Sequence, residues 1–337
     1  MARAKTRHTY VNKKVRDARC LSWTYNNVQG REEKIYFIGV IVNRMRKKVK
    51  RAFLVGINYR GSDSELGGCI NDVVVIRDIL ITKYGYSQSN ILLMTDDTEI
   101  KPTAANIIKG WKWLLSGSPA SNFLGPYIPL KSNERGHYFF HYSGHGSQVK
   151  DKNGDERDGC DETICPIDYP TAGMILDDVI RKKLAVKVPA RSKLISIIDA
   201  CHSESSIDLL WTAKVGPRDS FSLVKTGVYK QTKGDVIMLS GCRDDQTSAD
   251  VEIHLGDDMS EDNTDHMTDT EEPKPKKIAH GALTYALIEV LKQANFNITC
   301  DVLLKNVREY IKDNGLSDQV PCLSFGRRAS ISRKFTL

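Results

Sequence analysis

Two short apolar runs, each followed at once by reactive polar residues, constrain most strongly what this chain can fold into. The first run is His137–Phe140, continued by residues 141–146 (HYSGHG), and the second is Leu194–Ile198, continued by residues 199–203 (DACHS). Apolar runs of this kind, bounded by polar residues and glycine, are typical of buried strands in a parallel sheet. In an open α/β sheet, chemistry collects beyond the carboxyl ends of the strands. We therefore expect His145 and Cys201 to be delivered to one edge of such a sheet.

The rest of the chain alternates strand-like and helix-like segments. Strands are predicted at Ala52–Ile57, Ile91–Met94, His137–Tyr142, Leu194–Asp199, Val236–Ser240 and Cys322–Phe325. Helical spacing is found at Asn71–Tyr84, Thr103–Leu115, Ile175–Leu184, Ala282–Gln293 and Thr299–Asp313. This alternation predicts the α/β class, with a doubly wound, mostly parallel six-stranded sheet and helices on both of its faces.

Charge divides the chain into unequal parts. Residues 1–51 hold 15 Lys and Arg against 3 Asp and Glu, whereas the remaining residues have a net charge of −5. We expect a basic, poorly ordered N-terminal arm over residues 1–49 and a single domain over residues 50–337. Within that domain, eight of the sixteen residues from Asp257 to Glu272 are acidic. Such a stretch buries too little apolar surface to fold, which predicts a flexible insertion at about residues 252–278.

The same features bound the compartment and the partners. The longest apolar stretch near the N-terminus, Ile35–Val42, has eight residues and is too short to cross a bilayer. The eight cysteines show neither zinc-ribbon spacing nor a dense disulfide framework, so reduced thiols are expected. We expect a cytoplasmic protein, with the nucleus as the alternative, and no membrane partner. Basic runs are usually only solvated, so nucleic-acid binding by the arm ranks as a third hypothesis.

Cys201 and His145 form a candidate nucleophile and base. A thiol attacks well only as a thiolate, and an imidazole can take its proton and later protonate the leaving amine. Taken alone, the pair fits a structural cysteine and a hydrogen-bonded histidine equally well. His202 competes as the base, but an immediate neighbour of Cys201 usually points away. The N–H groups of Gly146 and Cys201 are candidates for an oxyanion hole.

Acidic residues gather around these two segments. Asp199 precedes Cys201 by two residues, so both side chains project to the same side of a strand. Asp72 begins a helix behind the first strand, although an acid there is also common at a helix N-terminus. Two carboxylates converging near a nucleophile favour a guanidinium or ammonium group.

A second acidic group follows the first histidine segment. Residues 151–162 resemble an EF-hand loop, but Glu156 stands where that loop requires glycine, and a strand precedes it, so we reject an EF-hand. Asp161, the pair Asp177-Asp178, and Asp208 would be strained if brought together without a hard cation such as calcium.

Several segments then combine into a recognisable order. They are residues 52–59 (AFLVGINY), 66–72 (LGGCIND), 142–146 (YSGHG), 175–178 (ILDD), 199–203 (DACHS), 240–242 (SGC), 246–250 (QTSAD) and 281–284 (GALT). Together they resemble type I metacaspases, the caspase-like cysteine proteases of plants, fungi and protists. The resemblance spans roughly residues 50–330.

The resemblance implies a caspase–hemoglobinase fold and a monomeric, calcium-dependent endopeptidase that cleaves protein or peptide substrates after Arg or Lys. It implies self-cleavage at basic residues, with Arg44–Arg51 and Thr212–Lys233 as candidates. The site residues it implies are the dyad His145 and Cys201, the specificity pocket Cys69, Asp72, Ser143 and Asp199, and the Ca²⁺ ligands Asp161, Asp177, Asp178 and Asp208.

Two departures from the family pattern lie beside the dyad, because Ser147 and Glu204 stand where glycine is frequent. Glu204 adds negative charge near Cys201, which would slow the reaction by raising the pKa of the thiol. A non-proteolytic interaction or protein-quality-control factor on the same scaffold is the alternative function.

Overall fold

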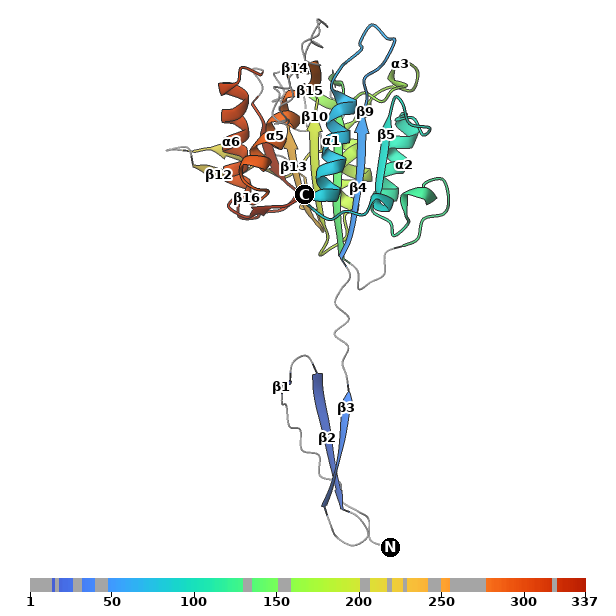
Figure 1. Ribbon diagram of the computed structural model, residues 1–337, viewed down its shortest axis with the longest axis vertical. Coiled ribbons are helices and arrows are strands. Elements are labelled where there is room, and N and C mark those ends of the chain that lie inside the picture. The colour runs from blue at the N-terminus through green and yellow to red at the C-terminus, as the bar shows by residue number, and fades with distance from the viewer. Residues whose placement is uncertain are drawn as a thin grey trace, which may run out of the picture. The chain divides into compact units, whose positions relative to one another are not determined.

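The chain divides into two units between Lys47 and Lys48. The computed structural model describes residues 14–15, 18–26, 32–39, 48–129, 135–150, 159–200, 207–216, 220–226, 229–241, 250–254, 277–316 and 320–337. In the first unit, strands β1 (Lys14–Val15), β2 (Ala18–Asn26) and β3 (Glu32–Gly39) form an antiparallel sheet in that order (Figure 1). These strands were not predicted from the sequence.

The second unit is built on one eight-stranded sheet, in the order β12-β11-β17-β13-β10-β6-β4-β5 (Figure 1). Its strands are β4 (Lys48–Gly56), β5 (Ile91–Thr95), β6 (Arg135–Ser143), β10 (Lys193–Asp199), β11 (Trp211–Val215), β12 (Phe221–Lys225), β13 (Asp235–Ser240) and β17 (Cys322–Phe325). The five strands from β5 to β13 are parallel, and β17, β11 and β12 add antiparallel partners at one side.

All six predicted strands lie in this sheet, but the predicted count of six was wrong. The two additional strands, β11 and β12, lie within residues 211–225, which showed no strand pattern in the sequence. In β11 only Thr212 and Ala213 are buried, while Lys214 and Val215 are exposed. A strand at the margin of a sheet buries little, so it carries no continuous apolar run.

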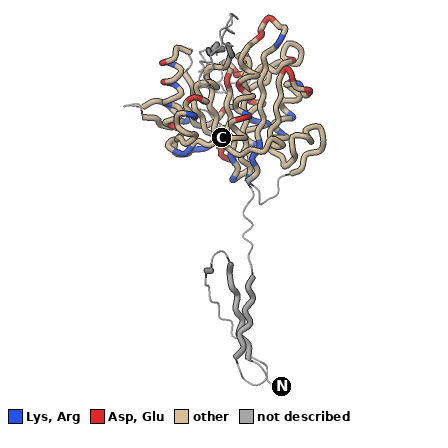
Figure 2. Tube along the Cα trace, viewed as in Figure 1, with Lys and Arg blue, Asp and Glu red and all other residues tan. Residues whose placement is uncertain are grey.

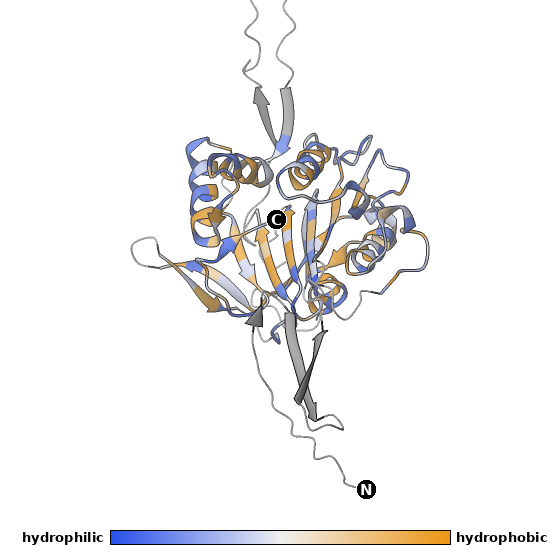
Figure 3. Cartoon of the chain, turned by 60° about the horizontal axis from the view of Figure 1, so that its bottom comes forward, coloured by the Kyte–Doolittle hydropathy of each residue, from blue (hydrophilic) through white to orange (hydrophobic). Residues whose placement is uncertain are grey.

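Helices cover both faces of the sheet, as predicted. They are α1 (Cys69–Thr82), α2 (Ala104–Leu114), α4 (Asp177–Lys183), α5 (Ala282–Gln293) and α6 (Cys300–Asp313). Side chains alternate along β4, so that Ala52 and Leu54 pack with α1, α5 and α6, whereas Phe53 and Val55 pack with α2 and α4. Figure 3 shows the resulting apolar colouring along the central strands.

Shorter elements lie around the sheet. Strands β7 (Gly146–Lys150), β8 (Cys160–Ile164) and β9 (Ile175–Leu176) form a small antiparallel sheet, so the helix predicted over Ile175–Leu184 begins with a strand. The other short helical elements are α3 (Tyr169–Ala172) and the 3-10 turns η1 (Gln88–Asn90), η2 (Ala120–Asn122) and η3 (Ala185–Lys187). Two further strand pairs are antiparallel: β14 (Asp250–His254) with β15 (Lys277–Gly281), and β16 (Ile298–Thr299) with β18 (Lys334–Phe335). Most of the predicted insertion, residues 255–276, lies outside the described residues.

Charged residues of the second unit lie mainly on its helices and loops (Figure 2). Across the described ranges, no helix combines the length and apolar character that crossing a membrane requires. Cys69, Cys160, Cys165, Cys300 and Cys322 form no disulfide among themselves.

Candidate active site

The strands that carry the two predicted catalytic segments are direct neighbours. β6 and β10 are parallel, and their last paired residues are Ser143 and Asp199. Beyond this pair, the N–H of Gly144 donates to the carbonyl of Asp199 at 3.2 Å. His145 follows Ser143 by two residues, and Cys201 follows Asp199 by two residues. Cys201 itself lies outside the described residues, as do His202 and Glu204.

One nitrogen of the His145 ring is fixed by the backbone. Its Nε2 lies 2.8 Å from the carbonyl oxygen of Ser64. A carbonyl can only accept a hydrogen bond, so Nε2 must carry the proton. In a neutral imidazole this leaves Nδ1 with the lone pair. The half-buried His145 therefore presents Nδ1 as its basic atom.

Two buried tyrosines support the His145 backbone. The N–H of His145 donates to the Tyr59 hydroxyl at 3.0 Å, and the Tyr142 hydroxyl donates to the carbonyl of His145 at 2.7 Å. The Tyr59 ring also packs against the imidazole, with ring centres 4.7 Å apart. Burial raises the pKa of both tyrosines, so that they remain neutral hydrogen-bond donors.

The glycines on either side of His145 serve different purposes. A Cβ on Gly144 would lie 2.8 Å from the Tyr142 hydroxyl and 2.9 Å from the Tyr59 hydroxyl, so any larger residue would disturb the tyrosines. Gly146, the predicted oxyanion-hole residue, is the first residue of β7 and stands opposite Ile164 of β8.

The predicted specificity residues come together beside this strand end. A Cβ built on Gly281 would lie 2.3 Å from Oδ2 of Asp199 and 2.8 Å from Oδ2 of Asp72, so the two carboxylates approach the same glycine. Ser143 donates through its hydroxyl to Oδ2 of Asp72 at 2.7 Å. Cys69 is buried and begins α1, the helix that carries Asp72 in its first turn.

Hydrogen-bond donors hold both carboxylates. Asp72 is fully buried and accepts from Nδ1 of His280 at 2.9 Å and from the N–H of Gly281 at 3.0 Å. Burial raises the pKa of Asp72, whereas the hydrogen bonds from His280 and Ser143 act in the opposite direction. Oδ2 of Asp199 accepts from both the N–H and the hydroxyl of Thr284, each at 2.8 Å.

His280 and Thr284 were not among the predicted site residues. Thr284 belongs to the segment 281–284 that supported the family resemblance, so its presence could have been suspected. His280 lies just outside that segment and is 208 residues from Asp72 in the sequence. No local pattern links the two positions.

The predicted calcium ligands lie in one region, on β8, on α4 and near the start of β11. Asp161, Asp177 and Asp208 are buried, and Asp178 is half-buried. Asp177 accepts the N–H of Glu162 at 2.9 Å and that of Asp178 at 2.7 Å. Their carboxylate oxygens are of the type that calcium prefers. Within the described ranges, however, no three or more His, Cys, Asp or Glu side chains form a group that could hold a metal ion.

An arginine stands among these acids. Arg181 donates to the backbone carbonyls of Asp208 and, at 2.9 Å, Lys230. Burial lowers the pKa of Arg181, while Asp208, Tyr229 and Asp178 favour its charged form. Its guanidinium lies 4.4 Å from the centre of the Tyr229 ring.

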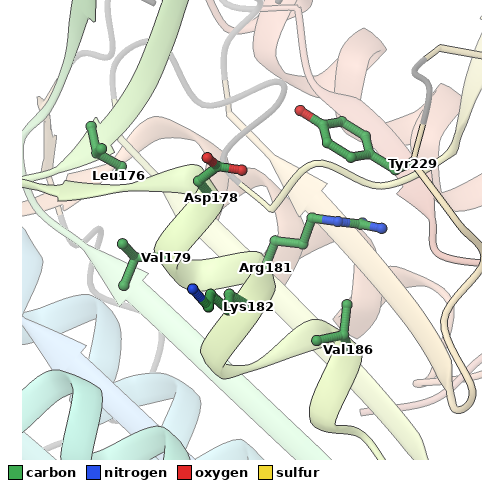
Figure 4. Close-up of a pocket in the computed structure, with 7 residues that line it drawn as sticks. All are labelled: Leu176, Asp178, Val179, Arg181, Lys182, Val186 and Tyr229. Carbon is green, nitrogen blue, oxygen red and sulfur yellow. The ribbon is translucent and has the colours of Figure 1, made fainter. Parts of the chain in front are cut away.

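A surface pocket of about 420 Å³ lies beside α4 (Figure 4). Of the predicted site residues, only Asp178 lines this pocket. Its other lining residues are Leu176, Val179, Arg181, Lys182, Val186 and Tyr229. The pocket is therefore a feature of the acidic region rather than of the His145 strand end.

Comparison with known proteins identifies the family of this chain. The family described as "Metacaspase, peptidase C14 domain" matches residues 50–210. Metacaspase-1 of Arabidopsis thaliana is 36% identical over 79% of this chain and 65% of its own length. Metacaspase-1 of Pyricularia oryzae is 32% identical over 82% of this chain and 71% of its own length. This chain therefore spans about two thirds of the length of such relatives.

The fold has a solved counterpart. A crystal structure of a protein from Geobacter sulfurreducens covers 85% of this chain and 97% of its own chain, with a TM-score of 0.53 and 20% sequence identity. That likeness concerns the fold alone. Together with the identity to the curated relatives, the parallel sheet and the His145 strand end lead to one conclusion, that this chain belongs to the metacaspase family.

Proposed function

We propose that this protein is a calcium-dependent cysteine endopeptidase that cleaves after Arg or Lys. The observation that carries the proposal is the orientation of His145, whose Nε2–H is engaged by Ser64 beside the strand that leads to Cys201. This arrangement supports a base at Nδ1, next to a pair of buried carboxylates suited to a cationic side chain.

The proposed reaction proceeds by acyl transfer. Nδ1 of His145 takes the proton of the Cys201 thiol, and the thiolate attacks the carbonyl carbon of the substrate. The resulting oxyanion accepts a hydrogen bond from the N–H of Gly146. As the C–N bond breaks, His145 protonates the leaving amine, which leaves a thioester on Cys201. Water then hydrolyses the thioester, with His145 again as the base.

The proposed preference for Arg or Lys rests on charge. Asp72 and Asp199 approach each other around Gly281. Cys69 lies on α1 together with Asp72, and Ser143 ends β6, the strand that pairs with the β10 strand of Asp199. A guanidinium or ammonium group offers both positive charge and several N–H donors to such a pair. A neutral or acidic side chain would leave the carboxylates without a cation.

Calcium is proposed as the activating ion, with Asp161, Asp177, Asp178 and Asp208 as its ligands. Support comes from the donor type and from the burial of three of these carboxylates within one region. When bound, calcium would supply positive charge that offsets the repulsion among them. Within the described ranges, these side chains do not by themselves form a group that could hold a metal ion. A calcium-binding measurement therefore tests this part of the proposal.

Peptide hydrolysis tests the proposal directly. The full chain should release a fluorophore from a peptide ending in Arg or Lys when calcium is present, and not from one ending in Asp. Cys201→Ala and His145→Ala should each reduce turnover by at least about a thousandfold, because nucleophile and base act as a unit. New N-termini in the wild-type protein after incubation with calcium would locate self-cleavage. Turnover retained by Cys201→Ala would contradict the proposed function.

A further inference from the structure

Asp72 has one described partner that is both ionisable and able to move. Its other donors are the Ser143 hydroxyl, which is buried on β6, and the backbone N–H of Gly281. The remaining donor is Nδ1 of His280, at 2.9 Å from Oδ1, on a side chain that is 13% exposed. A carboxylate offers about four acceptor positions, so these contacts occupy most of its capacity. A substrate cation that binds Asp72 must therefore compete with one of these donors.

Two backbone contacts hold His280 beside Asp72. A Cβ on Gly68 would lie 2.7 Å from the Cα of His280, so the two backbones are already in close contact. The next residue, Gly281, is tied to Asp72 through its N–H. The imidazole stacks against the Tyr285 ring, with centres 5.9 Å apart, and retains some contact with solvent. Rotation of the side chain is thus the way in which His280 can release Asp72.

We propose that His280 determines access to the specificity pocket, because its imidazole occupies the Asp72 carboxylate that a substrate Arg or Lys must reach. This inference rests on the proposed preference for basic residues and names a residue that regulates the same pocket. Protonated His280 neutralises Asp72 and places a second cation beside the incoming one. Neutral His280 offers only one hydrogen bond, which the substrate cation replaces with a charge-assisted one.

The charges around His280 are few in the described part of the chain. Asp72 on α1 faces it directly, and Asp199 on β10 reaches the adjacent Gly281. Tyr285 on α5 contributes the stacked ring. Acidification adds positive charge to a histidine that gains a proton, beside the carboxylate that the substrate cation must reach. Binding of basic substrates should therefore weaken as the pH falls, more than catalysis itself requires.

Two substitutions separate charge from shape. His280→Ala removes the competitor, and His280→Gln keeps an N–H donor but cannot become charged. At about pH 6 we expect His280→Ala to lower KM for an Arg-terminated peptide by about tenfold, the equivalent of one charge-assisted hydrogen bond. At about pH 8 the decrease should be several times smaller, and kcat should change less than KM at both values. His280→Gln should lie between the wild type and His280→Ala at the lower pH.

A matched substrate and a matched variant provide the controls. Citrulline has the shape of arginine without its charge, so a citrulline-terminated peptide should not reproduce the pH-dependent gain. Tyr285→Leu removes the ring stacked on His280 while leaving the contact with Asp72 in place, and should keep the wild-type pH dependence of KM. Equal KM values for wild type and His280→Ala at every pH, or the same gain with citrulline, would overturn the inference.

A binding measurement keeps this inference distinct from the proposed function. Calorimetry can follow agmatine, which carries the guanidinium of arginine, as it binds to the full-length Cys201→Ala chain with and without His280→Ala. We expect tighter binding in the double variant, with the larger gain at the lower pH. If the wild type hydrolyses no basic substrate, the proposed function fails, and agmatine binding still decides the role of His280. Agmatine affinity that is undetectable, or unaffected by His280→Ala, would contradict that role.

Discussion

The two groups of buried carboxylates in the second unit differ in what surrounds them. Asp72 and Asp199 accept from hydroxyls, from backbone N–H groups and from one imidazole, all on regular elements that pack around β6 and β10. In the acidic region, the backbone N–H groups of Glu162 and Asp178 donate to Asp177, and Arg181 donates to the backbone carbonyl of Asp208. Side-chain and backbone donors thus act together on the carboxylates of the first group, whereas backbone N–H groups donate to Asp177 in the second.

The two groups of carboxylates should therefore respond differently to a cation. A carboxylate that is already oriented by fixed donors is prepared for a transient cation such as a substrate side chain. Carboxylates that share one region repel each other, and a resident cation offsets that repulsion when it binds. Substitutions in the first group should therefore be insensitive to calcium, whereas substitutions in the second should be compensated by it.

The largest expected effect is the contrast between Asp72→Asn and Asp177→Asn. Asp72→Asn should lower kcat/KM for an Arg-terminated peptide by about a thousandfold, because it removes the buried carboxylate proposed to bind the substrate cation. Added calcium should not restore this loss. Asp177→Asn should instead raise the calcium concentration for half-maximal activity by about tenfold, with near-normal turnover once calcium saturates.

Calcium titrations of both variants, followed by peptide hydrolysis, check this contrast. Circular dichroism on each variant serves as the control for folding. The comparison breaks down if calcium rescues Asp72→Asn, or if Asp177→Asn leaves the titration unchanged. In the latter case the acidic region would be structural.

Acid should act on the framework of the pocket through His141, a buried histidine of β6. His141 is fully buried, its Nδ1 lies 3.3 Å from the carbonyl of Ile197, and its Nε2 has no hydrogen-bond partner among the described residues. Burial lowers the pKa of His141 to about 4, although the hydrogen bond to Ile197 acts in the opposite direction. The unfolded chain binds this proton below about pH 6.5, whereas the folded chain resists it. The contribution of His141 to the free energy of unfolding is therefore fully present above about pH 6.5 and is lost as the pH falls toward 4.

The size of this loss can be measured against a variant that cannot be protonated. His141 should contribute about 3 kcal/mol to the decrease in unfolding free energy between neutral pH and about pH 4. His141→Gln keeps an N–H donor and should show a correspondingly smaller decrease over the same range, whatever its stability at neutral pH. Urea unfolding followed by tryptophan fluorescence measures both proteins, with Trp111 and Trp113 as buried reporters. Identical pH dependence in the two proteins would contradict the assignment.

The two regions also differ in how far the sequence could predict them. Ser143 and Asp199 could be placed because each ends an apolar run, and the strands that carry them pair directly. The position of His280 could not, because its contact with Asp72 arises when β15 crosses the start of α1, and side chains so far apart in sequence share no period. Likewise, β11 and β12 bury too few residues to show an apolar pattern. For the acidic residues, the sequence gives the donor type but not the directions of the carboxylates, which depend on backbone contacts such as that from Glu162.

The smallest expected effect concerns a single hydroxyl at the pocket. Thr284 is fully buried and gives Asp199 both its N–H and its hydroxyl. Thr284→Val preserves the shape and the N–H but removes the hydroxyl, so kcat/KM for basic substrates should fall by about tenfold and stability by about 1 kcal/mol. Thr284→Ser, which keeps the hydroxyl, should retain most of the activity. Peptide kinetics at saturating calcium and urea unfolding measure the two effects. If Thr284→Val behaves like the wild type, the N–H of Thr284 orients Asp199 without the hydroxyl. Asp199 would then be oriented by a backbone N–H group, as Asp177 is. The difference between the two regions would in that case rest on the contact between His280 and Asp72.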